Sequence, residues 1–405
     1  MPPSDTTYFR KGFGLKAEVQ DDLASDYDGR LVDLLRERDY SLTSGDVTVR
    51  LAREFGFCYG VERAVEYAYQ TRRKFPDRRI YLVGEIIHNP HVNAKLREMG
   101  VEILVPGEVG FDYSVVKPED VVIMPAFGVT MADFETLRAL GCVMVDTTCG
   151  SVLNVWKRVE SYARDGYTSV IHGKYYHEET RATASQVSKY PDGHYLVVRH
   201  MDEARMVCDY IERKGMSRTD FLAKFGHASS PGFDPDVHLQ KVGVANQTTM
   251  LASESLAIGE ELGASMGRAY GAEHRAEHFR TFDTICSATQ DRQDAVKALL
   301  AEPLDVMIVV GGYNSSNTIS LAAICAEHVR TYHVEDATAI DPDTGEIRFR
   351  PAGLVHEERV ERGWLPAAGA LRIGLTAGAS TPNNKIGESV ARIFATRGIA
   401  SGDIR

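Results

Sequence analysis

The chain has 405 residues, enough for about two to four domains and a sizeable buried core. Its hydrophobic content of 43% and charged content of 25% are typical of a soluble globular protein. Its 46 Lys and Arg residues against 57 Asp and Glu residues give a net charge of −11, which argues against non-specific binding to nucleic acid or to a membrane surface. No apolar run approaches the length of a bilayer span, and the N-terminus lacks an apolar signal-peptide core and soon becomes acidic. We therefore expect a cytoplasmic protein with neither nucleic acid nor membrane as a partner.

The first part of the chain, residues 1–48, is polar, charged and weakly patterned. It predicts an N-terminal extension with one short helix within residues 32–40. From Val49 the pattern becomes one of alternating strands and helices, with helices expected around 61–74, 90–99 and 132–140. Apolar, β-prone segments mark the strands, at 49–54, 79–87, 120–129, 142–148, 168–173, 194–199, 241–247, 305–312, 331–335 and 371–378.

Continuous β-branched runs such as Val306–Val310 are typical of strands buried on both faces of a parallel sheet. Strands that alternate with helices indicate βαβ units, so the sequence predicts an α/β fold with small, mainly parallel sheets. Two loop-rich segments, 223–241 and 340–369, are expected to be insertions.

Three cysteines occupy the same kind of position, after a short β-prone segment and just before a helix-like run. They are Cys58, Cys149 and Cys286, and the last two share the motif Asp-Thr-x-Cys. A thiol at such a turn faces unpaired N–H groups and the positive end of a helix dipole, both of which favour the thiolate that binds metal. Three such turns suggest three similar units that each deliver one thiolate to an iron–sulfur centre with one open iron. We expect Cys142, Cys208 and Cys325 to pack in the core.

Polar clusters follow several of the predicted strands, where ligands bind in open α/β sheets. They contain His88; His172, His177, Glu178 and Glu179; Asn246 to Thr249; Asn314 to Asn317; and Ser380 with Thr381. The segments GGYNSSN and TAGAS have glycines and small polar donors that suit an anion, although no Walker loop is present. These patterns predict a phosphate or diphosphate ligand. The other histidines are expected to be structural or solvent-exposed, with His172 undecided.

Eight segments in series resemble the 4-hydroxy-3-methylbut-2-enyl diphosphate reductase family, between residues 56 and 382. They read GFCYGVERAV, EIIHNPHV, VDTTC, IHGKYYHEETRATAS, GVANQTTM, DTICSATQDRQDAV, VVGGYNSSNT and GLTAGASTP. The HGKYYHEET and NQTTM forms, Phe127 and the N-terminal extension are similar to the plant and cyanobacterial branch of that family.

The resemblance implies a [4Fe–4S] cluster held by Cys58, Cys149 and Cys286, with one open iron, among three α/β domains around a pseudo-threefold axis. It implies reduction of an isoprenoid diphosphate to isopentenyl and dimethylallyl diphosphate, with loss of the C4 hydroxyl as water. Ferredoxin or flavodoxin is the implied electron donor, and a homodimer is the candidate assembly. We place the domains at 49–148, 149–285 and 286–385, after the extension 1–48 and before a C-terminal helix and tail at 386–405.

The resemblance also assigns roles to individual residues. Glu179 matches the proton donor and Thr248 a threonine near the substrate hydroxyl. The diphosphate-binding positions match His88, His177, Ser315, Ser316, Asn317 and Ser380. Two positions depart from the common bacterial pattern: Phe127 stands where many members have His, and Gly150 where Pro is familiar.

Two other readings remain. A non-redox [4Fe–4S] hydro-lyase acting on a phosphorylated small molecule would also need an open iron, but it would work without an electron donor. A non-enzymatic cluster or zinc sensor is the third reading, and the absence of a Cys-x-x-Cys motif counts against structural zinc.

Overall fold

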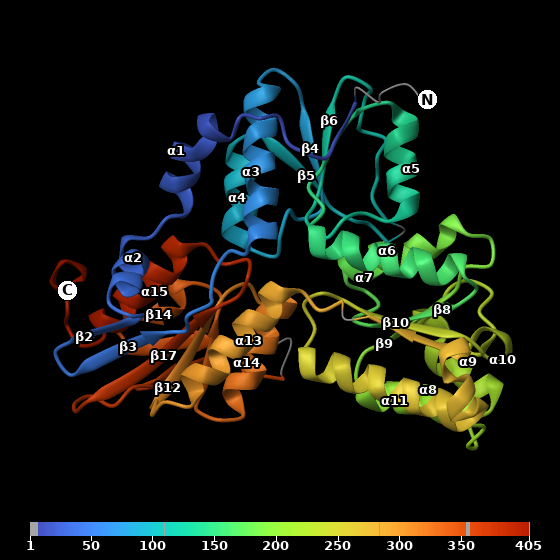
Figure 1. The fold of residues 1–405 in the computed structure, drawn as a ribbon. Helices are drawn as coiled ribbons and strands as arrows, with labels where there is room; N and C mark the ends of the chain where they lie inside the picture. The colour runs from blue at the N-terminus through green and yellow to red at the C-terminus, as the bar shows by residue number, and fades with distance from the viewer. Residues whose placement is uncertain (1–6, 109, 283, 354–356, 405) are drawn as a thin grey trace. The chain divides into compact units, whose positions relative to one another are not determined.

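The computed structural model describes residues 7–108, 110–282, 284–353 and 357–404. These residues divide into two compact units, whose helices and strands are labelled in Figure 1. The first unit contains the described residues of Met1–Arg10, Arg78–Gly84 and Glu102–Cys286, and the second those of Lys11–Asp77, Glu85–Val101 and Ser287–Arg405.

The first unit contains two sheets. One has the strand order β1-β7-β6-β4-β5, and the other has the order β11-β10-β8-β9 with every pairing parallel. The strands are β1 (Tyr8–Phe9), β4 (Ile80–Val83), β5 (Val101–Leu104), β6 (Val121–Met124), β7 (Val143–Asp146), β8 (Thr168–His172), β9 (Tyr195–Val198), β10 (Val242–Asn246) and β11 (Phe279–Thr281). The helices are α5 (Met131–Leu140), α6 (Gly150–Arg164), α7 (Glu178–Ser185), α8 (Met201–Ile211), α9 (Arg218–Phe225), α10 (Pro235–His238), α11 (Ala252–Tyr270) and α12 (Arg275–His278).

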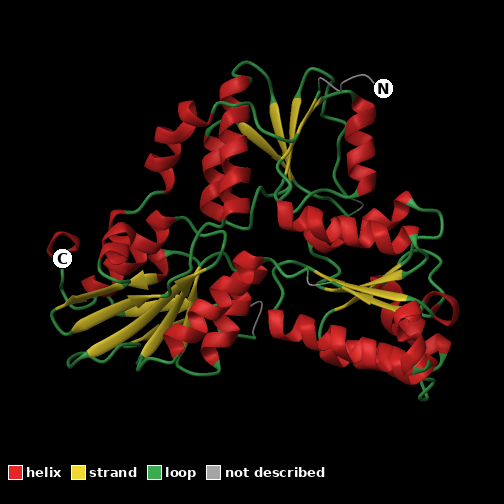
Figure 2. Cartoon of the chain, viewed as in Figure 1, coloured by secondary structure: helices red, strands yellow, loops and turns green. Residues whose placement is uncertain are grey.

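Helices lie on both faces of the β11-β10-β8-β9 sheet, with α6 and α7 on one side and α8 and α11 on the other (Figure 2). Such a sheet is buried on both faces, and for that reason β8 and β10 are buried at every position. The carboxyl ends of β8 and β10 lead directly into the polar segments that the sequence singled out.

The second unit contains a sheet of order β13-β12-β17-β3-β2, parallel except for the β2–β3 edge, and a small antiparallel sheet β14-β15-β16. Its strands are β2 (Ser41–Ser44), β3 (Val47–Leu51), β12 (Val306–Val310), β13 (Thr331–Val334), β14 (Ile340–Asp341), β15 (Glu346–Phe349), β16 (Arg359–Arg362) and β17 (Leu371–Ala377). Its helices are α1 (Lys16–Tyr27), α2 (Arg30–Glu37), α3 (Tyr59–Lys74), α4 (Pro90–Glu98), α13 (Ser287–Leu300), α14 (Ser316–Ala326) and α15 (Asn383–Ala395).

Helices α13 and α14 cover one face of the five-stranded sheet, and α2 and α15 cover the other (Figure 2). Alternate residues of the apolar strand β12, namely Val306, Ile308 and Val310, pack into one buried cluster with Leu31 and Leu35 of α2. The continuous β-branched run therefore fills both faces of a parallel strand, as the sequence predicts.

The α/β prediction is confirmed, with three mainly parallel sheets, but two segments contain more structure than expected. Residues 1–48 were expected to hold one short helix, yet α1, α2, β1 and β2 lie there. Residues 340–369 were expected to be loop, yet they contain the β14-β15-β16 sheet. The boundaries and pseudo-threefold arrangement of the three predicted domains stay predictions. Across the described residues, every helix is too short or too polar to span a membrane.

Candidate functional site

The three cysteines singled out by the sequence lie at helix starts. Cys58 is the N-cap of α3, and Cys149 is the N-cap of α6. Cys286 immediately precedes Ser287, the first residue of α13. By contrast, Cys142, Cys208 and Cys325 are buried in the core as expected. Burial raises the pKa of Cys142 and Cys208 to about 11 and that of Cys325 to about 12.

Within the first unit, Cys149 and Cys286 are neighbours. The hydroxyl of Ser151 donates a hydrogen bond to the Sγ atom of Cys286 at 3.3 Å. Burial raises the pKa of Cys149, and the charge of Cys286 raises it further, whereas the N–H groups of Ser151 and Val152 lower it. The N–H groups at the helix start lower the pKa of Cys149, as predicted, but burial raises this pKa by more. The metal-free Cys149 thiol is therefore harder to ionise than expected. A bound cation reverses that balance, because metal coordination deprotonates a thiol outright.

Glu179 and Thr248 form a buried pair in the same unit. Glu179 is 1% exposed in the first turn of α7, and Thr248, 5% exposed, follows β10. One carboxylate oxygen accepts the backbone N–H of Thr248 at 2.6 Å, and the other accepts its hydroxyl at 3.0 Å. Both carboxylate oxygens are thereby oriented by a single residue.

His177 is the N-cap of α7 and its ring is held beside this pair. Its Nδ1 atom accepts the backbone N–H of Glu179 at 3.2 Å, which places the ring proton on Nε2. The ring meets Phe127 edge-on, with centroids 5.6 Å apart. Phe127, which departs from the common bacterial pattern, therefore packs against His177, a residue predicted to bind the diphosphate.

Gln247 is a residue of this group to which the sequence gave no role. Its Oε1 atom accepts the backbone N–H of Lys174 at 3.1 Å and the hydroxyl of Thr180 at 3.0 Å. It thus ties the loop after β10 to the start of α7. His172, which the sequence left undecided, is fully buried with Nδ1 2.8 Å from the Ser255 hydroxyl.

In the second unit, His88 lies beside a carboxylate. Its Nδ1 atom is 2.9 Å from Oε2 of Glu85, and the amide of Asn314 donates to the same carboxylate at 3.1 Å. A carboxylate at Nδ1 fixes the orientation of the ring. Glu85 was not among the predicted residues, although the spacing Glu-x-x-His in the segment GEIIH was a visible signal.

The other predicted diphosphate residues of this unit surround the peptide of Ala379. The Ala379 N–H donates to Oδ1 of Asn317 at 2.9 Å, and the Ala379 carbonyl accepts the N–H of Cys58 at 3.2 Å. The Ser380 hydroxyl donates to the carbonyl of His88 at 3.1 Å, and Ser315 is the N-cap of α14. His88, Asn317 and Ser380 are therefore linked to the loop of Cys58; Ser316 is buried in the first turn of α14.

The amide nitrogen of Asn317 points to the ligand that this cluster suits. Its Nδ2 atom is buried and, among the residues described, donates no hydrogen bond. Because Oδ1 is fixed by Ala379, the amide cannot turn its donor away. A buried donor without a protein acceptor is costly, and an anionic oxygen would satisfy it.

Glycines allow these segments to meet closely. A Cβ atom on Gly312 would lie 2.7 Å from the carbonyl of His88, and one on Gly378 would lie 1.9 Å from Oγ1 of Thr318. Gly311 has φ +146°, which side chains rarely adopt. The glycines of GGYNSSN and TAGAS therefore leave no room for a side chain beside these neighbours.

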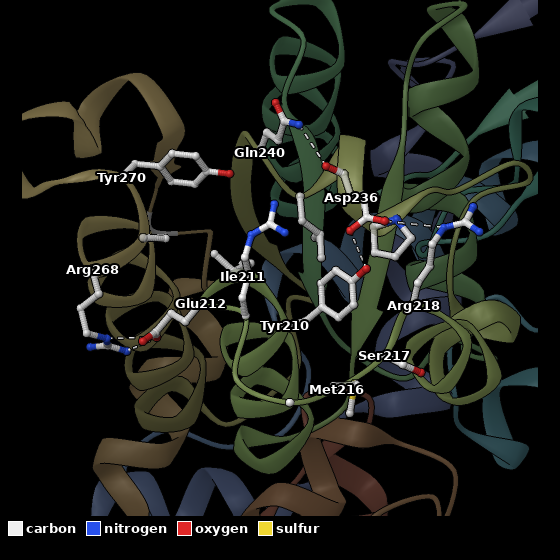
Figure 3. Close-up of a pocket in the computed structure, with 15 residues that line it drawn as sticks. Tyr210, Ile211, Glu212, Met216, Ser217, Arg218, Asp236, Gln240, Arg268 and Tyr270 are labelled. Carbon is white, nitrogen blue, oxygen red and sulfur yellow. Dashed lines mark hydrogen bonds and ion pairs between the residues drawn. The ribbon is translucent and has the colours of Figure 1, made fainter.

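A separate polar hollow of about 700 Å³ lies in the first unit, between the end of α8, the start of α9 and the end of α11 (Figure 3). Part of its polar lining is internally paired: Glu212 accepts from Arg268 at 2.8 Å, and Asp236 accepts the Tyr210 hydroxyl at 2.8 Å. None of the predicted site residues is among those that line it.

Comparisons with known proteins show which family the chain resembles. The LytB protein family matches residues 49–394. A protein of Thermosynechococcus vestitus named 4-hydroxy-3-methylbut-2-enyl diphosphate reductase is 48% identical over 399 residues, which cover 98% of this chain and 97% of the relative. The chain belongs to the LytB family of 4-hydroxy-3-methylbut-2-enyl diphosphate reductases. Members of this LytB family are iron–sulfur oxidoreductases.

A further relative is similar to the chain over nearly its whole length. A reductase of Gloeobacter violaceus is 48% identical and covers 97% of this chain and 93% of its own length. Together with the Thermosynechococcus relative, it supports the predicted resemblance to the cyanobacterial branch.

Two solved structures show the same fold. A structure of (E)-4-hydroxy-3-methyl-but-2-enyl diphosphate reductase, described as the terminal enzyme of the non-mevalonate pathway, matches with a TM-score of 0.51 and 28% identity over 85% of this chain and 98% of that chain. A reductase from Plasmodium falciparum matches with a TM-score of 0.60 and 21% identity over 84% of this chain and 86% of that one, which shows the fold alone.

Proposed function

We propose that this chain reduces (E)-4-hydroxy-3-methylbut-2-enyl diphosphate to isopentenyl diphosphate and dimethylallyl diphosphate, the last step of the methylerythritol phosphate pathway to isoprenoids. The reaction consumes two electrons and two protons and releases the C4 hydroxyl as water. The observation that carries the proposal is the buried Glu179–Thr248 pair, in a chain 48% identical over nearly its whole length to a reductase of that name.

Cys58, Cys149 and Cys286 are the ligands we propose for a [4Fe–4S] cluster with one open iron. Their donor chemistry fits, because each thiol stands at a helix start, and the N–H groups of Ser151 and Val152 already act on the Cys149 sulfur. When bound, such a cluster supplies electrons and a Lewis-acidic iron that polarises the substrate hydroxyl.

Glu179 and Thr248 are the proposed proton-handling residues. Thr248 holds both carboxylate oxygens of Glu179, so a proton carried there is presented in a fixed direction. While it donates to the Glu179 carboxylate, the Thr248 hydroxyl can accept from the substrate hydroxyl; when Glu179 carries a proton and donates to Thr248, the Thr248 hydroxyl can donate to the substrate. A carboxyl and a hydroxyl in contact form a short path for the proton that leaves with the water.

The diphosphate is proposed to bind His88, His177, Ser315, Ser316, Asn317 and Ser380. The unsatisfied Nδ2 of Asn317 and the Ser315 N-cap at the start of α14 supply donors at a helix end, which favours an anion. Anchoring the diphosphate positions the reacting carbon, so remote binding energy serves the chemical step. Phe127 contributes no hydrogen-bonding group there, which leaves the histidines a larger share.

The proposal also includes an electron donor of the ferredoxin or flavodoxin type, a cytoplasmic location and a homodimer as the candidate assembly. These proposals follow from the family resemblance and, for the location, from the acidic composition of the chain.

Anaerobic turnover with reduced viologen as donor tests the function. We expect substrate-dependent oxidation of the viologen and formation of both five-carbon diphosphates. A preparation with a full cluster that consumes no substrate would contradict the proposal. Loss of water from a phosphorylated substrate without any donor would instead indicate the hydro-lyase.

A further inference from the structure

Arg292 is a buried arginine on α13 that the proposed reaction does not use. It is 3% exposed. Its Nη2 atom donates to the carbonyl of Gly56 at 2.7 Å, and its Nη1 atom donates to the carbonyl of Ala288 at 2.8 Å. Weaker bonds run from Nη2 to the carbonyl of Phe55 at 3.4 Å and from Nε to that of Gly56 at 3.3 Å. One guanidinium thus binds two separate stretches of backbone.

Those two stretches are next to proposed cluster ligands. Gly56 is two residues before Cys58, and Ala288 is two residues after Cys286. The Cys58 loop is also held to the segment after β17, because the N–H of Cys58 donates to the carbonyl of Ala379 at 3.2 Å. Gly56 has φ +66°, so the turn at this carbonyl depends on glycine. Arg292 therefore ties the backbone that leads into Cys58 to the first turn of the helix that follows Cys286.

Among the residues that the structure describes, the charge of Arg292 has no protein counter-ion. Within the described part of the chain, no carboxylate lies within ion-pair distance of its guanidinium, and its acceptors are neutral carbonyls. A buried charge without an anion is costly. Arg397 in the same unit provides the contrast, because it binds the carbonyl of Pro366 and also pairs with Asp46 at 2.6 Å.

We propose that Arg292 is a positioning residue for the iron–sulfur cluster, which fixes the backbone around two of its ligands and supplies the positive charge that balances the reduced cluster. This inference rests on the three-cysteine ligation proposed above. Three thiolates outweigh the charge of an oxidised [4Fe–4S] core, so the site is anionic and becomes more so on reduction. A fixed cation nearby stabilises the reduced form and raises the reduction potential, since net charge is one of the factors that set the potential of such clusters.

The test compares anaerobically reconstituted holoprotein of the wild type with three variants. Arg292→Gln removes the positive charge and most of the hydrogen bonds to the backbone. Arg292→Lys keeps the charge but loses the planar guanidinium that bonds two stretches of backbone at once. Arg397→Gln is the matched control for the loss of a largely buried arginine that binds backbone. The readouts are iron per chain, the midpoint potential of the cluster and the rate at which its absorbance is lost in air.

We expect Arg292→Gln to make the one-electron reduction equilibrium about tenfold less favourable, a shift of about 59 mV to more negative potential. We expect both Arg292 variants to lose the cluster in air several-fold faster than the wild type. Arg292→Lys should keep a potential close to that of the wild type, and Arg397→Gln should match the wild type in both readouts.

Wild-type potential and lifetime in Arg292→Gln would overturn the inference. If Arg292→Gln does not fold, Arg292→Lys decides alone: a wild-type lifetime would overturn the positioning role. A wild type that takes up no cluster at all would contradict the three-cysteine proposal itself, and it is told apart from failure of the Arg292 inference by the wild-type iron content.

Discussion

At the scale of single residues, the proposed chemistry depends on which side-chain atoms already make hydrogen bonds within the protein. Glu179 has both carboxylate oxygens bound to Thr248, and Asn317 has its oxygen bound and its nitrogen unsatisfied. The first arrangement orients a proton donor, and the second offers a donor to an anion. Each can be tested by a substitution that preserves shape.

Glu179→Gln should leave the fold and cluster in place and lower kcat by about 10²-fold or more, the usual scale for loss of a general acid. The amide can still accept the N–H of Thr248 and can donate to its hydroxyl, so the local bonds are retained. Viologen-coupled turnover measures the effect. The adjacent, exposed Glu178→Gln should lose little, and equal losses in the two variants would contradict the proton role.

Asn317→Asp should raise KM by tenfold or more while iron content stays unchanged. The aspartate keeps the acceptor for the Ala379 N–H, but it replaces the unsatisfied Nδ2 donor by a negatively charged oxygen that repels a diphosphate. Steady-state kinetics with varied substrate measures this. The control Asn154→Asp makes the same change on the exposed side of α6, and an unchanged KM in Asn317→Asp would remove this residue from the diphosphate site.

His333 predicts a pH dependence of stability. Burial lowers its pKa to about 4, while its Nε2 donates to the carbonyl of Gly311 at 2.9 Å, in the segment GGYNSSN. Because the folded pKa lies below the unfolded value of about 6.5, the unfolded chain binds more protons at acid pH. The stabilisation is therefore complete above about pH 6.5, and about 3 kcal/mol of it is lost as the pH falls to about 4.

The measurement is the free energy of unfolding of metal-free protein against pH, compared with His333→Gln. Glutamine can keep the bond to Gly311 but does not titrate, so the variant should show a shallower loss below pH 6.5. Identical pH profiles would show that His333 does not contribute.

At the scale of elements, the starts of α3, α6 and α13 matter most, because each of these three lies at a proposed cluster ligand. The start of α6 is the clearest case. Cys149 has φ −61° and ψ 142°, the extended conformation that a residue before proline adopts, and a Cβ on Gly150 would meet nothing within 4 Å. Although Gly150 stands where proline is familiar, the backbone of this turn is therefore compatible with proline.

Gly150→Pro should stabilise the protein by about 0.4–1 kcal/mol, because proline at the first helical position restricts the unfolded chain. The N–H groups that act on Cys149 belong to Ser151 and Val152, so they are retained. Gly128→Ala should do the opposite, since Gly128 has φ +76° and a Cβ would lie 2.3 Å from the Trp156 ring. The urea midpoint of metal-free protein should rise for the first variant and fall for the second; a fall for both would refute this account of the turn.

Regular elements with a strong local signal were predictable from the sequence. The helices expected at 61–74 and 90–99 are α3, Tyr59–Lys74, and α4, Pro90–Glu98. The missed strands carry little local signal: β1 has two residues, and β16 reads Arg-Val-Glu-Arg and is mostly exposed. Neither length nor periodicity could reveal them, since β1 forms by pairing with the distant β7 and β16 by pairing with β15.

The residues of the candidate site also divide into those with a local sequence signal and those without one. The cysteines, His177 and Glu179 stand in recognisable local patterns, and the structure places each at or near a helix start. Arg292 could not be found from local sequence, because its carbonyl partner at Gly56 is 236 positions away. Ser151, whose hydroxyl bonds Cys286 across 135 positions, was missed for the same reason.

At the scale of the whole molecule, the residues of the proposed site are drawn from both compact units. The first contains Cys149, Cys286 and the Glu179–Thr248 pair, and the second contains Cys58 and the cluster around Asn317.

The N-terminal extension takes part in both units. In the first, β1 pairs with β7, and the Tyr8 hydroxyl donates to Asp146 at 2.6 Å. The other oxygen of Asp146 accepts the N–H of Thr148 at 2.9 Å, next to Cys149. In the second, β2 completes the edge of the five-stranded sheet. The extension is therefore part of the folded body.

The central claim is that Cys58, Cys149 and Cys286 together hold one catalytic iron–sulfur cluster. Iron content and viologen-coupled turnover, measured anaerobically on the six single Cys→Ser variants, test it most directly. We expect the variants of these three to lose the cluster and its turnover, while those of Cys142, Cys208 and Cys325 keep both. Full iron and full turnover in any of the first three, or cluster loss confined to Cys208→Ser, would contradict the ligand assignment.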